Sequence, residues 1–276
     1  MTNCIESVAT LNNGLQMPWL GLGTFTRDSG QAIQDMIADA LSAGFRSIDT
    51  ASIYKNEVSV GNALKNSEVA RKDIFLTTKV WNEDQRKRRT LQAFEESLKR
   101  LGTDYVDLYL IHWPVADCYL QTWQVMEEIY RSGRAKAIGV SNFLIPHLED
   151  ILQNSDTVPC VNQIEFHPYL TQTELIKYCQ NNKIQVAAWS PLMQGLIASE
   201  ATLLRLAKKY KKTPAQIVLR WDLQHQVVTI PKSVTTNRII ENTQIFDFEL
   251  SDQDMSIIDA LNQDKHLGPD PANFDF

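Results

Sequence analysis

The stretch VDLYLIHWP, residues 106–114, guides the interpretation of the whole chain. Residues 106–111 are apolar apart from one aspartate and one tyrosine, which is typical of a short buried strand. His112 and Trp113 follow at the point where that strand ends. In parallel α/β barrels, functional groups gather at the carboxyl ends of the strands. We therefore expect the functional site at this end of the strand.

Two earlier segments place polar side chains at strand ends in the same way. The run FRSI, residues 45–48, leads into Asp49, and Tyr54 follows shortly after. The run DIFLTT, residues 73–78, leads into Lys79. Together with His112, these residues supply an acid, a phenol, an amine and an imidazole, a set suited to proton transfer. Each has an ordinary structural explanation when taken singly, so the prediction depends on all four meeting at one face.

Short apolar runs alternate with amphipathic stretches along the chain. We expect strands at residues 20–23, 46–48, 74–79, 106–111, 135–140, 160–165, 184–189 and 227–230. We expect helices near residues 29–43, 57–65, 90–101, 120–131, 144–152, 174–181 and 215–224. Eight strand–helix units predict a parallel sheet closed into a (β/α)8 TIM barrel. A single domain over residues 1–276 is expected.

An open, doubly wound sheet is the structural alternative. It would usually carry Gly-x-Gly-x-x-Gly in its first strand-to-helix turn, whereas residues 21–26 read GLGTFT. Residues 10–17 are expected to form a β-hairpin, because Asn13 and Gly14 can supply the positive φ angles of a tight turn. This hairpin is predicted to close the N-terminal end, or bottom, of the barrel. Gly44 and Gly102 are expected to end two helices.

The composition argues against several classes of partner and location. The chain has 276 residues, 43% of them hydrophobic, and a net charge of −6, so we expect no nucleic-acid or anionic membrane partner. The basic run RKRR, residues 86–89, is interpreted as a solvated helical face. No segment has the roughly 18 apolar residues of a membrane span. The four cysteines show neither metal-ligand spacing nor a disulfide pattern, so we expect no metal and a cytoplasmic location. We also expect a monomer.

The four polar side chains suit the protonation of an alkoxide that forms when hydride reaches a carbonyl carbon. A free phenol has a pKa near 10 and is a weak acid at neutral pH. Lys79 would lower the pKa of Tyr54 as a nearby cation, and Asp49 would hold the ammonium in place. His112 would orient a substrate oxygen. On residue types alone, a Schiff-base aldolase with Lys79 as nucleophile stays open.

Four longer motifs reveal a family resemblance. They are GFRSIDTA (44–51) with Tyr54 and residues 56–57, LYLIHWP (108–114), IGVSNF (138–143), and IPKS (230–233) with Arg238 and residues 241–242. The chain resembles the aldo-keto reductases over nearly its whole length. The resemblance implies the catalytic tetrad Asp49, Tyr54, Lys79 and His112, with Tyr54 as proton donor, and NADP(H) as cofactor. Residues 267–271 and 274–276 are similar to microbial glyoxal, methylglyoxal and 2,5-diketogluconate reductases.

The same resemblance implies where the cofactor binds. Ser141, Asn142 and Gln163 match positions that bind the nicotinamide carboxamide, and Trp189 matches the aromatic residue that stacks on that ring. Other residues match positions along the pyrophosphate and around the 2′-phosphate and adenine: Thr24, Ser190, Leu192, Gln194, Lys232, Ser233, Val234, Thr235, Arg238, Glu241 and Asn242. Cationic side chains near a helix N-terminus form a natural phosphate pocket.

Aromatic side chains near strand ends are the candidates for the substrate pocket. We expect Phe25, Trp81, His112 and Trp113 to line it, and Trp19 to be a further candidate. Few residues separate residue 114 from the next helix, so the pocket should be open and accept small carbonyls. The implied function is NADPH-dependent reduction of small aldehydes, ketones and dicarbonyls such as methylglyoxal or glyoxal. A keto-sugar reductase of the 2,5-diketogluconate type and a nicotinamide-binding regulatory subunit are the alternatives.

Overall fold

The computed structural model describes residues 4–26 and 30–276, and its centre is a barrel of parallel strands. The strands follow one another around the barrel in chain order from β3 to β10. Their bounds are β3 Leu22–Gly23, β4 Ser47–Asp49, β5 Phe75–Val80, β6 Leu108–Ile111, β7 Ile138–Ser141, β8 Val161–Glu165, β9 Gln185–Trp189 and β10 Val228–Thr229. The Gly21 amide donates to the Thr229 carbonyl at 2.9 Å, which closes the ring between its first and last strands. The predicted (β/α)8 barrel is confirmed.

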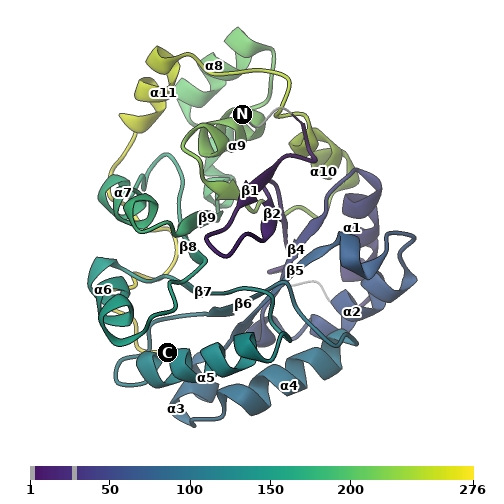
Figure 1. Ribbon diagram of the computed structural model, residues 1–276. Coiled ribbons are helices and arrows are strands. Elements are labelled where there is room, and N and C mark those ends of the chain that lie inside the picture. Colours follow the sequence, from purple (N-terminus) through teal and green to yellow (C-terminus); the bar gives the residue numbers. More distant parts are fainter. Residues whose placement is uncertain (1–3, 27–29) are drawn as a thin grey trace.

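Helices surround the barrel and connect its strands (Figure 1). The main ones are α1 Gln31–Ser42, α2 Glu57–Asn66, α4 Thr90–Leu101, α5 Tyr119–Arg131, α6 Ile145–Asn154, α7 Thr173–Asn181 and α9 Pro214–Gln224. Sequence analysis missed α3 Asn82–Arg86, α8 Ala201–Tyr210 and α11 Asp252–Asp259, and it expected a helix near Arg238 without bounds, where α10 Thr236–Thr243 lies. The expected start of the first helix at residue 29 lies outside the described residues. Three short 3-10 helices, η1 Ser52–Tyr54, η2 Arg71–Asp73 and η3 Met193–Ala198, complete the connections.

Local sequence explains where several helices begin and end. Gly102 adopts φ 63° directly after α4, and Gly44 adopts φ 101° just after α1. Both are left-handed conformations that glycine adopts at little cost, as expected for helix C-termini. Thr213 precedes Pro214 and accepts a hydrogen bond from the Gln216 amide, which completes a capping box at the start of α9.

The N-terminal hairpin lies across one end of the barrel, at the centre of Figure 1. Strands β1 Val8–Thr10 and β2 Gln16–Pro18 pair antiparallel, and Met17 packs with inward-facing residues of β5, β6 and β8. The expected bottom closure is confirmed. The turn itself differs from the prediction, because only Gly14 has a positive φ angle (87°). Asn13 instead accepts a hydrogen bond from the Leu15 amide through its side chain, an Asx turn that a five-residue connection allows.

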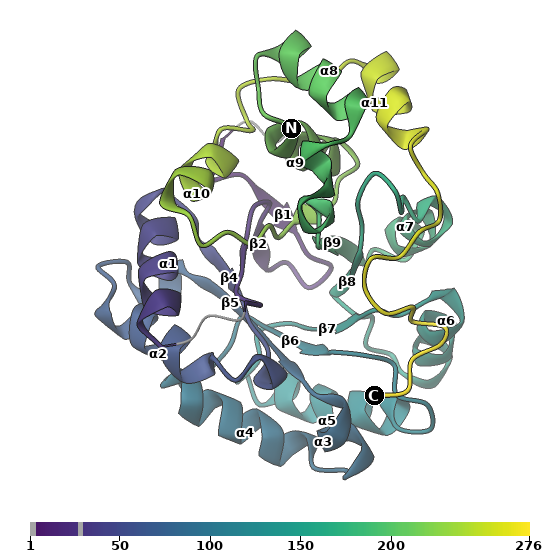
Figure 2. The same ribbon diagram turned by 180° about the vertical axis from the view of Figure 1, so that it is seen from behind.

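The opposite end of the barrel carries the loops that follow the strands. Figure 2 shows this face, with the segment after α11, residues 262–276, running across it past β8. The basic run at residues 86–89 begins at the last residue of α3 and ends just before α4, and in it Lys87 pairs with Glu83 and Arg89 with Asp84. Among the described residues, no helix combines the length and apolar character needed to cross a membrane.

Candidate active site

A cavity of ≈ 1010 Å³ opens at the end of the barrel where the strands finish. It is lined by residues from the ends of β3, β4, β6, β7, β8 and β9 and by the connections that follow them. Parallel strands in register bring such residues together: Asp49 pairs with Thr77 across β4 and β5, and Lys79 lies two residues further along β5. Asp49 and Lys79, which are 30 residues apart in the sequence, therefore lie together at the cavity floor.

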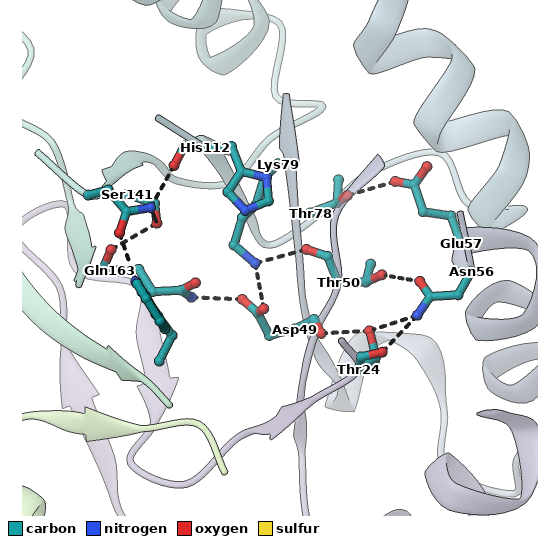
Figure 3. A network of polar contacts seen from close by, with 12 residues as sticks. Thr24, Asp49, Thr50, Asn56, Glu57, Thr78, Lys79, His112, Ser141 and Gln163 are labelled. Carbon is teal, nitrogen blue, oxygen red and sulfur yellow. Dashed lines mark hydrogen bonds and ion pairs between the residues drawn. The ribbon is translucent and has the colours of Figure 1, made fainter. Parts of the chain in front are cut away.

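Asp49 and Lys79 form a buried ion pair beneath the cavity (Figure 3). The Lys79 ammonium donates to Asp49 Oδ1 at 2.5 Å and to the Thr50 carbonyl at 3.0 Å. The Gln163 amide donates to Asp49 Oδ2 at 2.8 Å. Lys79 has no exposed surface, and Asp49 is 5% exposed. Both carboxylate oxygens of Asp49 are thus occupied, and the ammonium is held in one position.

Tyr54 lies on η1, above this ion pair. Its ring centroid is 5.3 Å from the Lys79 nitrogen, 4.9 Å from the Phe25 ring and 5.7 Å from the His112 ring. Sequence analysis predicted that Lys79 lowers the pKa of Tyr54. That prediction is wrong for the net shift, which is upward. Burial raises the pKa of Tyr54, and the opposing charge of Lys79 only partly offsets it, with Asp49 raising it further. Desolvation of a phenolate outweighs one nearby cation that is already paired with a carboxylate.

The protonation states of Lys79 and His112 follow from their surroundings. Burial lowers the pKa of Lys79, but the charge of Asp49, the hydroxyl of Tyr54 and their hydrogen bonds raise it more, so the net pKa is raised. Burial and then the charge of Lys79 hold the pKa of His112 well below its usual value. At neutral pH the amine is therefore charged and the imidazole is neutral.

A second layer of polar contacts fixes the strand ends that carry these groups (Figure 3). The buried Asn56 side chain accepts from the Thr50 hydroxyl at 2.7 Å and donates to the Thr24 carbonyl at 2.8 Å. The Thr50–Asn56 bond closes the base of the loop that holds Tyr54. Sequence analysis placed Asn56 in a motif without giving it a role. The sequence feature that could have indicated this role is the position of Asn56, two residues after Tyr54.

Glu57 performs a similar task for β5. It accepts from the Thr78 hydroxyl at 2.6 Å and from Arg100 of α4 at 2.6 Å. Glu57 is 1% exposed. Thr78 directly precedes Lys79 in β5, so the Glu57–Arg100 ion pair, buried at its carboxylate and partly exposed at its guanidinium, connects the lysine's strand to the outer layer of helices. A buried carboxylate of this kind needs such partners, because an unpaired charge in the interior is costly.

The residues expected to bind the carboxamide are joined to each other and to the tetrad. Ser141 donates to the Gln163 carbonyl at 2.8 Å. The Asn142 amide donates to the His112 carbonyl at 2.9 Å, and its oxygen accepts from the Trp189 indole at 2.8 Å. Asn142 has φ 64°, a left-handed conformation that asparagine tolerates better than most residues. This geometry fixes the Trp189 ring beside the cavity.

The cavity continues from Trp189 to the start of α10. All the cofactor candidates line it: Thr24, Ser141, Asn142, Gln163, Trp189, Ser190, Leu192, Gln194, Lys232, Ser233, Val234, Thr235, Arg238, Glu241 and Asn242. The exposed cations Lys232 and Arg238 flank the N-terminus of α10. Free backbone amides and two cations at one helix end favour an anion.

Aromatic rings form the other wall of the cavity. Phe25, Trp81, His112 and Trp113 all line it, whereas Trp19 does not. Trp19 is instead half-buried against the barrel core, and its carbonyl accepts from the Thr229 amide of β10 at 2.9 Å. Sequence analysis placed Phe276 in a terminal motif without giving it a pocket role; its ring stacks 5.8 Å from Trp81 and lies 5.2 Å from Trp113. No local signal could place a residue so distant in sequence.

Sequence analysis gave no lining role to several further residues, although Ile230 and Pro269 lie in motifs that it quoted. These further residues are Gly23, Ile53, Pro191, Gly195, Ile197, Ala198, Thr213, Pro214, Ala215, Ile230 and Pro269. Lys79 is absent from the lining because it lies behind Asp49 with no exposed surface. Within residues 4–26 and 30–276, no group of three or more histidine, cysteine or acidic side chains is arranged to hold a metal ion.

Comparison with known proteins identifies the family. The aldo/keto reductase family model matches residues 19–263. Glyoxal reductase of Bacillus subtilis is 54% identical over 271 residues, 98% of each chain. Methylglyoxal reductase DkgA of Escherichia coli is 46% identical and covers 97% of this chain and 98% of its own. The crystal structure of a Bombyx mori aldo-keto reductase in complex with NADP has a TM-score of 0.89 and 36% identity, covering 95% and 94% of the two chains.

A matched family model over most of the chain, two full-length relatives and a shared barrel agree with the resemblance seen in the motifs. The chain belongs to the aldo/keto reductase family.

Proposed function

We propose that the chain reduces small aldehydes, ketones and dicarbonyls to alcohols with NADPH. One observation carries the proposal: the Asp49–Lys79 pair, Tyr54 and His112 meet at the floor of a single cavity that extends to a cationic helix N-terminus. Proton-transfer chemistry and a phosphate-binding end therefore belong to one site. The names of the Bacillus subtilis and Escherichia coli relatives support the choice of glyoxal and methylglyoxal as substrates.

The residues present fit NADP(H). The half-buried Trp189 offers a flat aromatic face beside the tetrad. Lys232 and Arg238, at the far end of the cavity, would hold the 2′-phosphate. Ser190, Met193 and Gln194 have positive φ angles of 51–54°, and the loop they form would cover the pyrophosphate. When bound, the reduced nicotinamide supplies hydride to the carbonyl carbon.

Tyr54 completes the reaction by giving its hydroxyl proton to the oxygen that becomes the alcohol. Its raised pKa keeps that proton in place until negative charge develops on the substrate. Lys79 then stabilises the phenolate that remains, and Asp49 holds Lys79 so that it cannot turn away. Solvent protons restore the hydroxyl for the next turnover.

His112 would orient the carbonyl as a neutral hydrogen-bond donor. Its Nδ1 atom is buried without a hydrogen-bond partner in the described part of the chain. An unpaired acceptor costs less than an unpaired donor, so we assign the proton of the neutral ring to Nε2. A neutral ring also avoids a second positive charge beside Lys79.

The alternatives fit this site less well. A Schiff-base aldolase needs a neutral, accessible amine, but Lys79 is fully buried, paired with Asp49 and raised in pKa. A regulatory subunit would not need a buried ion pair aligned with a phenol. The short connection between β6 and α5 and the exposed Phe25, at 69%, leave the cavity open to small polar carbonyls. A keto-sugar of the 2,5-diketogluconate type satisfies the same description.

The test is a comparison of kcat/KM across substrates with NADPH as the reductant. Methylglyoxal, glyoxal, 2,5-diketogluconate and a steroid ketone represent the competing classes. We expect the two small dicarbonyls to be reduced most efficiently. A steroid reduced far more efficiently than methylglyoxal would contradict the open-pocket argument. A borohydride-trapped adduct on Lys79 during turnover would favour the aldolase.

A further inference from the structure

A buried carboxylate next to Trp189, across β8 and β9, has no part in the mechanism above. Glu165 is the last residue of β8, two positions after Gln163, and is 1% exposed. Its Oε1 atom accepts from the backbone amides of Leu267 at 2.8 Å and Gly268 at 3.0 Å. Its Oε2 atom pairs with His266 Nδ1 at 2.9 Å. One carboxylate therefore holds three consecutive residues that lie about a hundred positions away in sequence.

The segment that Glu165 holds presses directly on Trp189. A β-carbon built on Gly268 would lie 2.5 Å from Trp189 Cη2 and 3.0 Å from Cζ3, closer than atoms pack. The backbone of residue 268 therefore lies in direct contact with the indole. Trp189 is fixed at the other end of its ring by the hydrogen bond from its indole nitrogen to Asn142. The Leu267 carbonyl also accepts from Gln194, in the loop that follows β9.

We infer that Glu165 is a positioning residue: by holding residues 266–268 it sets the plane of Trp189 and so the fit of the nicotinamide half of the cofactor. The inference rests on the proposed function, because it assumes that Trp189 stacks on the nicotinamide. Residues 266–268 together with the Glu165 carboxylate are called the latch below.

The contacts around Glu165 are those of an ionised carboxylate. Burial raises the pKa of Glu165, but hydrogen bonds from His167, the Leu267 amide and His266 together lower it by more than burial raises it. The net shift of the pKa is therefore downward. The titratable groups facing it are the two histidines, of which His167 lies at 3.1 Å and is fully buried. A charged acceptor bonds backbone amides more strongly than a neutral one. The latch is therefore stable while Glu165 keeps an acceptor oxygen in place.

Four variants separate the latch from a general effect on folding. Glu165→Leu keeps the bulk of the side chain but leaves the amides of Leu267 and Gly268 without an acceptor. Glu165→Gln keeps one acceptor oxygen and should rescue most of the loss. Gly268→Ala leaves Glu165 intact but pushes a methyl group into Trp189. Glu174→Leu makes the same chemical change on the exposed face of α7 and is the control.

The measurement is the Kd of two probes, NADPH and adenosine 2′,5′-bisphosphate, which has the phosphate end but no nicotinamide. We expect Glu165→Leu and Gly268→Ala to weaken NADPH binding about three- to tenfold, the size of a lost aromatic stacking contact. Binding of the bisphosphate should change less than about twofold, since its site lies at α10. If Glu165→Leu does not fold, Gly268→Ala still tests the Trp189 contact.

Two results would overturn the inference. NADPH affinity that stays at the wild-type level in the folded Glu165→Leu and Gly268→Ala proteins would show that the latch does not position Trp189. Equal losses for NADPH and the bisphosphate would mean a general disturbance of the barrel. A wild-type chain that binds neither probe would instead refute the proposed function itself, and the latch with it.

Discussion

Replacing Tyr54 with phenylalanine removes the proposed proton donor and little else. The ring keeps its contacts with Phe25 and His112, because those depend on the aromatic face and edge. Lys79 keeps its two remaining partners, Asp49 and the Thr50 carbonyl. The variant therefore isolates one hydroxyl in an otherwise unchanged site.

The magnitude follows from what that hydroxyl does. Loss of a positioned general acid slows catalysis about 10²–10⁴-fold, which is about 2.7–5.4 kcal/mol of transition-state stabilisation. The stability of the fold should change by no more than about 1.5 kcal/mol, the value of one hydrogen bond. The affinity for NADPH should change less than about twofold, because Tyr54 contributes only to the cavity floor.

The assay follows the loss of NADPH absorbance with saturating methylglyoxal, with cofactor affinity measured separately by tryptophan fluorescence. Tyr130→Phe is the matched control, since the Tyr130 hydroxyl contacts Asn13 at the hairpin end of the barrel. It should keep full activity. A Tyr54→Phe enzyme with a kcat within about threefold of wild type would refute the assignment, because general acid catalysis cannot be worth so little.

Four further predictions follow from the same geometry. Lys79→Met should abolish reduction, measured as kcat, because it leaves Asp49 a buried unpaired carboxylate and removes the cation beside Tyr54; substantial turnover would contradict this. Arg238→Ala should weaken NADPH about tenfold and leave NADH almost unchanged in fluorescence titration, whereas equal losses would place the 2′-phosphate elsewhere. Asn56→Ala should lower the free energy of unfolding in urea by about 2–3 kcal/mol, since a buried donor and a buried acceptor lose their partners; a change near zero would refute that role. The kcat for reduction should stay constant between about pH 6.5 and 9 and fall only as Tyr54 loses its proton at higher pH, and a titration near pH 6.5 would show that His112 is not held neutral.

Local patterns in the sequence predicted much of the architecture. The alternation of apolar runs and amphipathic stretches identified eight strand–helix units, since side-chain periodicity reports which face of an element is buried. Glycine at residue 102 marked the end of α4, because the left-handed conformation there is a local requirement. The strand ends placed Asp49, Lys79 and His112 on one face, since all strands of a parallel barrel point the same way. Short helices such as α11 escaped detection because eight residues carry too little periodicity.

Other properties depend on distant parts of the chain and only the tertiary structure decided them. The pKa of Tyr54 is raised, whereas the sequence predicted that it would be lowered. Desolvation depends on every residue packed around the phenol, but the sequence argument considered only the nearby cation Lys79. Phe276 reached Trp81, and Glu165 reached residues 266–268, through contacts between segments about one to two hundred positions apart. A sequence lists the groups that can ionise, donate or stack. Which of them meet, and how far from water, is fixed only when the barrel closes.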